Sequence, residues 1–193
     1  MDFDAIIFIG PQGSGKGTQA KLFAEKLGFF YLGTGAMLRE IATHGDKMGK
    51  KIKGIIDQGR LVDDATIVKI VKENIAAVPR NKGIIFDGIP RRAVQAEYLM
   101  NLLNSDGRTR VATVYLSLPH DESVNRLVKR AEIEGRNDDT RERIELRLKQ
   151  YEQETVPVLG YLKKVTRFFE IDGTPPPAGV TEEIAGALDV SLA

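Results

Sequence analysis

The chain of 193 residues contains no cysteine and no tryptophan, and only two histidines. The absence of cysteine excludes disulfides, thiolate catalysis and a zinc site built on cysteine. It is compatible with a reducing cytoplasm, where we expect the protein to reside. His44 and His120 lie in polar, turn-like stretches without partners at metal-ligand spacing. We therefore expect surface histidines and not a metal site or a general base.

Long apolar runs and a strong net charge are also missing. No apolar run approaches the roughly 18 residues that span a bilayer, and the acidic start Met1–Asp4 lacks the basic and apolar regions of a signal peptide. The formal net charge of +1 gives no overall attraction to nucleic acid or to anionic membrane surfaces. Any anion binding must therefore come from local clusters of basic residues.

A glycine-rich stretch, Gly10–Gln19, follows the apolar run 5–9 and precedes a well-patterned helix. This order is a phosphate-binding arrangement, because glycines tolerate positive φ and let successive N–H groups curl around an anion at the helix N-terminus. Lys16 adds a full positive charge. The strict P-loop pattern has Ser or Thr directly after the lysine, whereas here Gly17 precedes Thr18. The alternative is a turn that only connects two elements, but the flanking strand and helix favour a nucleoside triphosphate site.

Short apolar runs alternate with helical patterns along the whole chain. Strands are expected at 5–9, 29–32, 83–87, 111–118 and 167–171. Uniformly apolar strands are typical of parallel sheets that are covered on both faces. We therefore predict an α/β fold with a five-stranded, doubly wound parallel sheet of the P-loop NTPase type, in one domain over 1–193. A long helix is expected from Asp139, which with Glu142 is close to a capping box, toward Pro157.

Arginines near the expected carboxyl ends of the strands are a second signal, because open α/β sheets bind ligands there. These residues are Arg91, Arg126, Arg130, Arg136 and Arg147. Arg126 and Arg130 are four residues apart, and such a like-charged pair is unfavourable unless an anion compensates it. A solvated helix face with ordinary salt bridges, for example Glu122 with Arg126, is the alternative. Spacing alone does not decide between the two.

Asp87 ends the third apolar run, where a carboxylate can orient Mg²⁺ or its water shell beside bound phosphates. A turn residue that caps its own backbone is the alternative interpretation. Ser14 and Thr18 lack a histidine base at a recognisable spacing, so we do not expect nucleophilic catalysis.

Taken in order, these motifs resemble the nucleoside monophosphate kinases, and most closely the adenylate kinase family with a short lid. The resemblance covers nearly the whole chain. The matching segments are Gly10–Thr18, Gly33–Arg39, Gly59–Asp64, Asp87–Arg91 with Gln95, Gly135–Asp139 and Gly173–Thr174. The chain departs from the family pattern at three places. In the phosphate loop, the family usually has Pro just before the second glycine. Ala36 replaces a usual Asp, and Ile89 replaces a usual Phe. None of these departures removes a charged ligand of the nucleotides.

The resemblance implies a core domain with two small mobile insertions, a monophosphate-binding insertion at 33–62 and a short lid at 129–139. The implied ATP-binding residues are Gly13, Ser14, Gly15, Lys16, Gly17, Thr18, Arg126, Arg130 and Pro175. The implied AMP-binding residues are Thr34, Arg39, Arg60, Leu61, Val62, Gly88, Arg91, Gln95, Arg136 and Arg147. Catalytic roles are implied for Lys16, Asp87, Arg91, Arg130, Arg136 and Arg147. Mg²⁺ is expected to be held by the nucleotide phosphates and water, with Thr18 and Asp87 nearby.

The implied activity is MgATP + AMP ⇌ 2 ADP, which serves adenine nucleotide homeostasis. Thr34 and Gln95 favour adenine, because pyrimidine-specific relatives usually carry a small residue and Asn at these positions. A UMP/CMP kinase is the near alternative, and a nucleotide-sensing module without turnover is the distant one. The expected partners are ATP, AMP and ADP, with no nucleic acid and no membrane. A monomer is expected, because no apolar stripe demands a partner.

Overall fold

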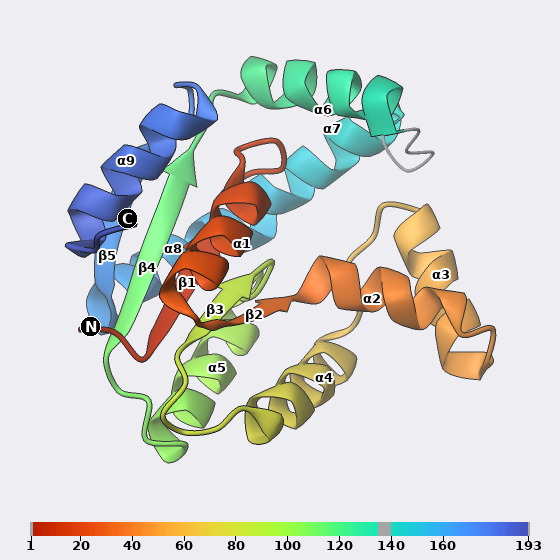
Figure 1. The fold of residues 1–193 in the computed structure, drawn as a ribbon. Helices are drawn as coiled ribbons and strands as arrows, with labels where there is room; N and C mark the ends of the chain where they lie inside the picture. Colours follow the sequence, from red (N-terminus) through yellow and green to blue (C-terminus); the bar gives the residue numbers. More distant parts are fainter. Residues whose placement is uncertain (1, 135–139, 193) are drawn as a thin grey trace.

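The computed structural model describes residues 2–134 and 140–192. Five parallel strands form one sheet in the order β2-β3-β1-β4-β5 (Figure 1). The strands are β1 (Ala5–Ile9), β2 (Phe30–Gly33), β3 (Ile84–Asp87), β4 (Val111–Ser117) and β5 (Arg167–Asp172). The prediction of an α/β fold with a five-stranded parallel sheet is confirmed, and β1 has the bounds that its apolar run predicts.

Helices follow every strand and cover the sheet on both sides (Figure 1). They are α1 (Lys16–Leu27), α2 (Thr34–Thr43), α3 (Lys47–Asp57), α4 (Asp64–Ala77), α5 (Ala93–Ser105), α6 (His120–Glu134), α7 (Arg141–Gln150), the π-helical turn η1 (Tyr151–Thr155), α8 (Val156–Val165) and α9 (Pro177–Leu188). Within the described residues, no helix is long and apolar enough to cross a membrane.

The central strand β1 contributes to two separate apolar clusters. Ile6 and Phe8 belong to the cluster that β1 forms with α1 and α9, whereas Ile7 and Ile9 belong to the cluster with α4, α5 and α8. Successive side chains of a strand point to opposite faces, so an uninterrupted apolar run supplies both clusters. The two layers of helices fix the strands and thereby the loops that leave their carboxyl ends.

The two predicted insertions differ in how they are built. Helices α2 and α3 pack on each other and extend away from the sheet (Figure 1), with Leu38 and Ile52 joining the larger core cluster. Gly33, the predicted start of this insertion, is the last residue of β2. Within the predicted lid, residues 129–134 are the end of α6, and residues 135–139 lie outside the described part of the chain. The bounds of both insertions remain predictions.

The predicted helix toward Pro157 is wrong in its extent. Helix α7 ends at Gln150, and the chain continues through η1 into α8. A π turn makes i→i+5 bonds, and Pro157 then falls in the first turn of α8, where its missing N–H costs nothing. The start also differs, because Thr140 occupies the N-cap of α7 without a side-chain cap bond and Asp139 lies outside the described residues.

Arg108 is the largest fully buried side chain, at 2% exposed. Its Nη2 group donates to the carbonyl oxygens of Val78 (3.3 Å), Pro79 (2.8 Å) and Lys82 (3.1 Å). It also forms an ion pair with Asp106. One guanidinium thus joins the loop before β3 to the loop before β4, at the end of the sheet away from the glycine-rich stretch.

Replacing Arg108 with leucine should lower the free energy of unfolding by about 3 kcal/mol, because it leaves buried carbonyls without their donor and removes the buried partner of Asp106. Urea unfolding would measure the change. Arg80→Ala is the matched control, since the Arg80 side chain is 79% exposed and contacts the same Asp106; we expect a loss below about 0.5 kcal/mol there. Equal losses in the two variants would contradict a structural role for the buried guanidinium.

Candidate functional site

The glycine-rich stretch forms a compact loop between β1 and α1. Gly13 and Gly15 have φ values of +86° and +85°, in the left-handed region that favours glycine. A Cβ on Gly13 would lie 3.0 Å from the carbonyl oxygen of Ser123, so the loop packs closely against the start of α6. Helix α1 begins at Lys16, whose Nζ donates to the Pro11 carbonyl at 3.0 Å. The loop therefore combines a helix N-terminus with an ammonium group, as anion binding requires.

The space around Gly17 explains why this loop departs from the strict P-loop pattern at that position. A Cβ at this position would lie 3.1 Å from Oδ2 of Asp87, tighter than ordinary van der Waals contact. The Ser or Thr of the strict P-loop pattern would therefore crowd the carboxylate that ends β3. Glycine at 17 lets Asp87 approach α1, and the hydroxyl is supplied one residue later by Thr18.

A cavity lined mainly by cationic side chains, called here the cationic cavity, lies beside this loop. Its lining residues are Gln12, Gly13, Gly15, Lys16, Gly17, Thr18, Lys21, Tyr31, Gly35, Ala36, Arg39, Asp87, Gly88, Arg91, Arg126, Leu127, Arg130 and Arg147. Asp87 is the one carboxylate among the described residues that line it. So many positive charges around one carboxylate favour a ligand that carries several negative charges.

Burial in this cavity lowers the pKa of Lys16 to about 8. Asp87 opposes the shift, whereas Arg91, Arg130 and Arg147 add to it. Burial also lowers the pKa of Arg91, again with Asp87 opposing, although a guanidinium stays charged at neutral pH. These shifts reflect first the cost of burying each cation and then the repulsion between neighbouring cations, and the negative charge of a bound polyphosphate would oppose both shifts.

The pKa of Lys16 predicts a pH dependence of ATP use. Raising the pH above about 8 removes the Lys16 proton in the free protein, so kcat/KM for ATP should fall there. Bound phosphates raise the pKa again, so kcat should hold to higher pH. Initial rates from pH 6.5 to 10 test this. In Lys16→Arg, whose side chain stays charged, the falling limb should vanish, and its persistence would assign the limb to another group.

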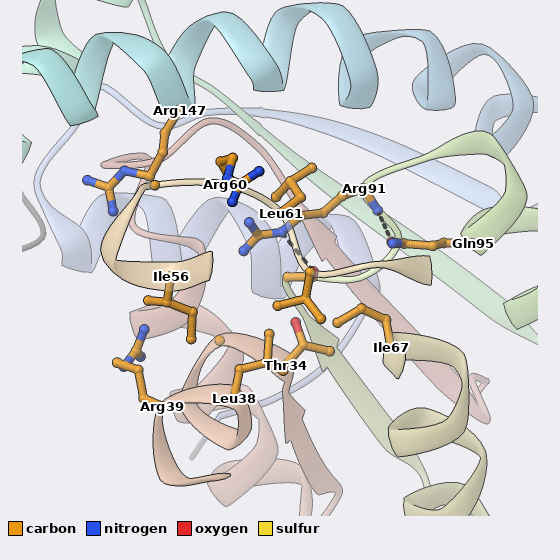
Figure 2. A pocket seen from close by; sticks show the side chains of 14 residues that line it. Thr34, Leu38, Arg39, Ile56, Arg60, Leu61, Ile67, Arg91, Gln95 and Arg147 are labelled. Carbon is orange, nitrogen blue, oxygen red and sulfur yellow. Dashed lines mark hydrogen bonds between the residues drawn. The ribbon is translucent and has the colours of Figure 1, made fainter. Parts of the chain in front are cut away.

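A second cavity, called here the apolar cavity, adjoins the first and is shown in Figure 2. Its lining residues are Thr34, Gly35, Leu38, Arg39, Ile56, Gly59, Arg60, Leu61, Val62, Ile67, Gly88, Arg91, Gln95 and Arg147. Figure 2 shows Arg147 reaching in from α7 and Arg39 lying on the opposite side, with Leu38 and Ile67 below. Aliphatic walls with a few polar groups suit a flat heterocycle, and the arginines at the rim suit a phosphate.

Gln95 lies in the apolar cavity with its amide already oriented. Its Oε1 accepts from the Arg91 backbone N–H at 2.8 Å, and its Nε2 donates to Oδ1 of Asp64 at 2.7 Å. An amide offers two donors and two acceptor positions, so one of each remains for a ligand. That pair matches the exocyclic amine and N1 of adenine. Thr34 lies nearby and donates to the Asp87 carbonyl at 3.2 Å.

Five residues line both cavities, and they form what is called here the shared wall. They are Gly35, Arg39, Gly88, Arg91 and Arg147. Two ligands, one in each cavity, would come into contact at this wall. The arrangement suits transfer of a charged group between two bound molecules.

Comparison with known proteins agrees with this geometry. Residues 8–167 match the protein-family model described as "Adenylate kinase". The chain is similar to the adenylate kinase of Thermus thermophilus, with 39% identity over 186 residues, which is 96% of this chain and 97% of that protein. It is 37% identical to the adenylate kinase of Bacteroides thetaiotaomicron over 184 residues, 95% of this chain and 97% of that protein. The chain belongs to the adenylate kinase family. The similarity extends to the adenylate kinase of Archaeoglobus fulgidus, at 35% identity over 211 residues, 95% of this chain and 97% of that protein.

Of the described residues implied by the adenylate kinase resemblance, Ser14 and Pro175 do not line either cavity. Ser14 is 2% exposed, and its backbone N–H donates to the Pro11 carbonyl within the loop. Its position is therefore structural. Pro175 packs near Gly179. Arg136 lies outside the described residues. Arg126 lines the cationic cavity and donates to the carbonyls of Gly173 and Thr174, at 2.8 and 2.9 Å.

Several lining residues were missed by sequence reasoning. In the apolar cavity they are Ile56 and Ile67, whose apolar spacing indicated only helix faces. In the cationic cavity they include Lys21 and Tyr31. The sequence signal for Tyr31 is Gly33, because a glycine two residues after a tyrosine on a strand leaves room for the ring to lie along the sheet.

Proposed function

We propose that this protein catalyses MgATP + AMP ⇌ 2 ADP by in-line transfer of the γ-phosphoryl group. The observation that carries this proposal is the shared wall, where Arg39, Arg91 and Arg147 face two adjoining cavities. The polyphosphate of ATP would occupy the cationic cavity over Lys16, and AMP would occupy the apolar cavity with its phosphate at the wall. The two ligands would then meet end to end.

The proposed roles of the residues follow the position of each around the two cavities. The ATP phosphates would be held by Gly13, Gly15, Lys16, Gly17, Thr18 and Arg130, with Arg126 and Pro175 nearer the base. AMP would be held by Thr34, Arg39, Arg60, Leu61, Val62, Gly88 and Gln95. Arg91 and Arg147 would act on both phosphates, and we retain Arg136 as a proposed third such group.

The chemistry asks little of the protein beyond placement and charge. An oxygen of the AMP phosphate attacks the γ-phosphorus, the bond from that phosphorus to the bridging oxygen breaks, and the ADP product leaves with that oxygen. The acceptor phosphate is already anionic at neutral pH, so no general base is required. Lys16, Arg91 and Arg147 would neutralise charge on the transferring oxygens, and their fixed positions supply the catalysis.

Mg²⁺ is proposed as the cofactor, brought in with ATP. Among the described residues no group of three or more His, Cys, Asp or Glu side chains could hold a metal ion, so a metal fits best as a nucleotide-bound ion. Asp87 and the Thr18 hydroxyl, both on the cationic cavity, are oxygen groups suited to a hydrated Mg²⁺. The ion would reduce the negative charge of the phosphates when it is bound.

Exclusion of water is the remaining requirement, since water would compete with AMP for the γ-phosphate. Gly59, near the end of the proposed insertion, lies against α7, where a Cβ on Gly59 would approach Leu146, Arg143 and Arg147 at 3.7 to 3.8 Å. The proposed insertion at 33–62 can thus meet the helix that carries Arg147. Closure of this kind is the known behaviour of adenylate kinase lids, and we propose it for the 129–139 segment. A cytoplasmic monomer remains part of the proposal.

A single assay separates this function from its two alternatives. ATP is offered with AMP, UMP, CMP or GMP in turn, and ADP formation is followed. We expect AMP to be preferred at least roughly a hundredfold, because Gln95 retains one donor and one acceptor that match adenine. Preference for UMP or CMP would indicate a pyrimidine kinase, and no turnover with tight ATP binding would indicate a sensing module. Failure to bind two adenosines joined by five phosphates would contradict the shared wall itself.

A further inference from the structure

Tyr31 is a side chain of the cationic cavity that the proposed reaction does not use. It lies on β2, half-buried, with the ammonium of Lys21 5.8 Å from its ring centroid. Its hydroxyl donates to Oδ2 of Asp87 at 2.8 Å. The phenol therefore contacts the one carboxylate among the described lining residues of the cavity.

The local sequence makes this contact possible. Gly33 pairs with Asp87 in the register of β2 and β3, and Tyr31 lies on the same face of β2 as Gly33. A Cβ on Gly33 would lie 2.5 Å from the Tyr31 hydroxyl oxygen and 2.6 Å from the ring. The ring therefore extends over Gly33 toward the neighbouring strand, and any larger residue at 33 would displace it.

The contact fixes Asp87 at a second point. Thr34 already donates to its backbone carbonyl at 3.2 Å, and Gly17 brings α1 close to Oδ2. With Oδ2 held by Tyr31, rotation of the carboxylate is restricted and the direction of Oδ1 is set. A carboxylate surrounded by Lys16 and Arg91 would otherwise turn toward one of these cations.

The chemical nature of the donor matters. Burial and the nearby Asp87 raise the pKa of Tyr31, so the phenol stays protonated and neutral at physiological pH. A neutral donor orients a carboxylate without cancelling its charge, in contrast to a lysine or an arginine. The full negative charge of Asp87 then remains available to a cationic ligand.

We propose that Tyr31 is a positioning residue that holds Asp87 in the orientation needed to accept hydrogen bonds from the water shell of nucleotide-bound Mg²⁺. The inference rests on the proposed role of Asp87 beside the metal. In this arrangement the Tyr31 hydroxyl does not contact the metal or its water shell and acts only through the Asp87 carboxylate. Partners of this kind that orient a metal-binding group typically change metal affinity or activity by 10- to 100-fold.

The test uses Tyr31→Phe, which removes one oxygen and keeps the ring. Binding of Mn²⁺ to the protein–ATP complex, followed by electron paramagnetic resonance, should weaken roughly tenfold. The Mg²⁺ concentration that gives half-maximal activity should rise and kcat should fall roughly tenfold, whereas KM for AMP should stay within about twofold. Tyr98→Phe is the matched control, because Tyr98 lies on α5 outside both cavities, and it should behave as wild type. Unchanged Mn²⁺ affinity in Tyr31→Phe would overturn the inference.

Two further variants identify the route of the effect. In an Asp87→Asn background, Tyr31→Phe should cause no further loss of Mn²⁺ affinity, because Tyr31 acts through that carboxylate. Additive losses would indicate a direct contact with the ligand and overturn the inference. Gly33→Ala should reproduce the Tyr31→Phe loss by displacing the ring, and wild-type Mn²⁺ affinity there would contradict it. If Asp87→Asn alone left Mn²⁺ binding unchanged, the metal role of Asp87 would be wrong and the inference would fail with it.

Discussion

Replacing Lys16 with methionine is expected to lower kcat by about a thousandfold or more while the fold persists. The Lys16 ammonium lies over the loop at 3.0 Å from the Pro11 carbonyl, at the point where the helix N-terminus and the cationic cavity meet. Methionine has a similar length but no charge. Because burial already lowers the pKa of Lys16, removing its charge should not destabilise the protein.

A coupled assay of ADP formation and thermal unfolding together test this expectation. Lys26→Met is the control, since Lys26 lies in the last turn of the same helix, exposed and outside both cavities. It should keep wild-type turnover. Near-normal turnover in Lys16→Met would remove the glycine-rich loop from the mechanism. A large drop in melting temperature in Lys16→Met would instead assign the lysine to folding.

The strands could be predicted closely because both faces of this sheet are covered. A strand buried on two sides is apolar along its buried length, as all of β1 and the first three residues of β3 are in the sequence. Helices follow from apolar spacing, but their ends depend on distant contacts. The continuation of α7 through η1 could not be predicted, because Pro157 read as a stop and the π turn that accommodates it has no local signal.

The sequence indicated which charged residues could form the candidate site, but it could not give their arrangement around the two cavities. Convergence of the arginines on one anion was one of two interpretations that their spacing left open; Arg91, Arg126, Arg130 and Arg147 line the cationic cavity, and Arg126 also forms the alternative ion pair with Glu122 at 2.7 Å. Which of them line both cavities depends on long-range packing, because Arg147 comes from α7 and Arg91 from the segment that follows β3. Tyr31 was missed for a related reason, because its contact with Asp87 depends on the pairing of two strands that are remote in sequence.

Arg91→Ala should lower kcat by about a thousandfold, with KM for ATP changed by less than roughly fivefold. Arg91 lies on the shared wall, so its guanidinium would act on the group that moves and not on the part of ATP held by the loop. Its Nε donates to the Gly88 carbonyl at 3.0 Å, and its backbone N–H bonds to Gln95. The side chain is thus aimed before any ligand arrives, and the interaction costs no reorganisation during transfer.

The neighbouring arginine supplies the control for Arg91. Arg92 lines neither cavity and forms ion pairs with Asp64 at 3.3 Å and Glu154 at 3.2 Å. Arg92→Ala should therefore affect stability and leave kcat within about threefold of wild type. Arg91→Lys should recover only part of the lost rate, because an ammonium keeps the charge but lacks the planar pair of donors. Equal kcat in Arg91→Ala and Arg92→Ala would mean that the wall between the cavities is not where the phosphoryl group crosses.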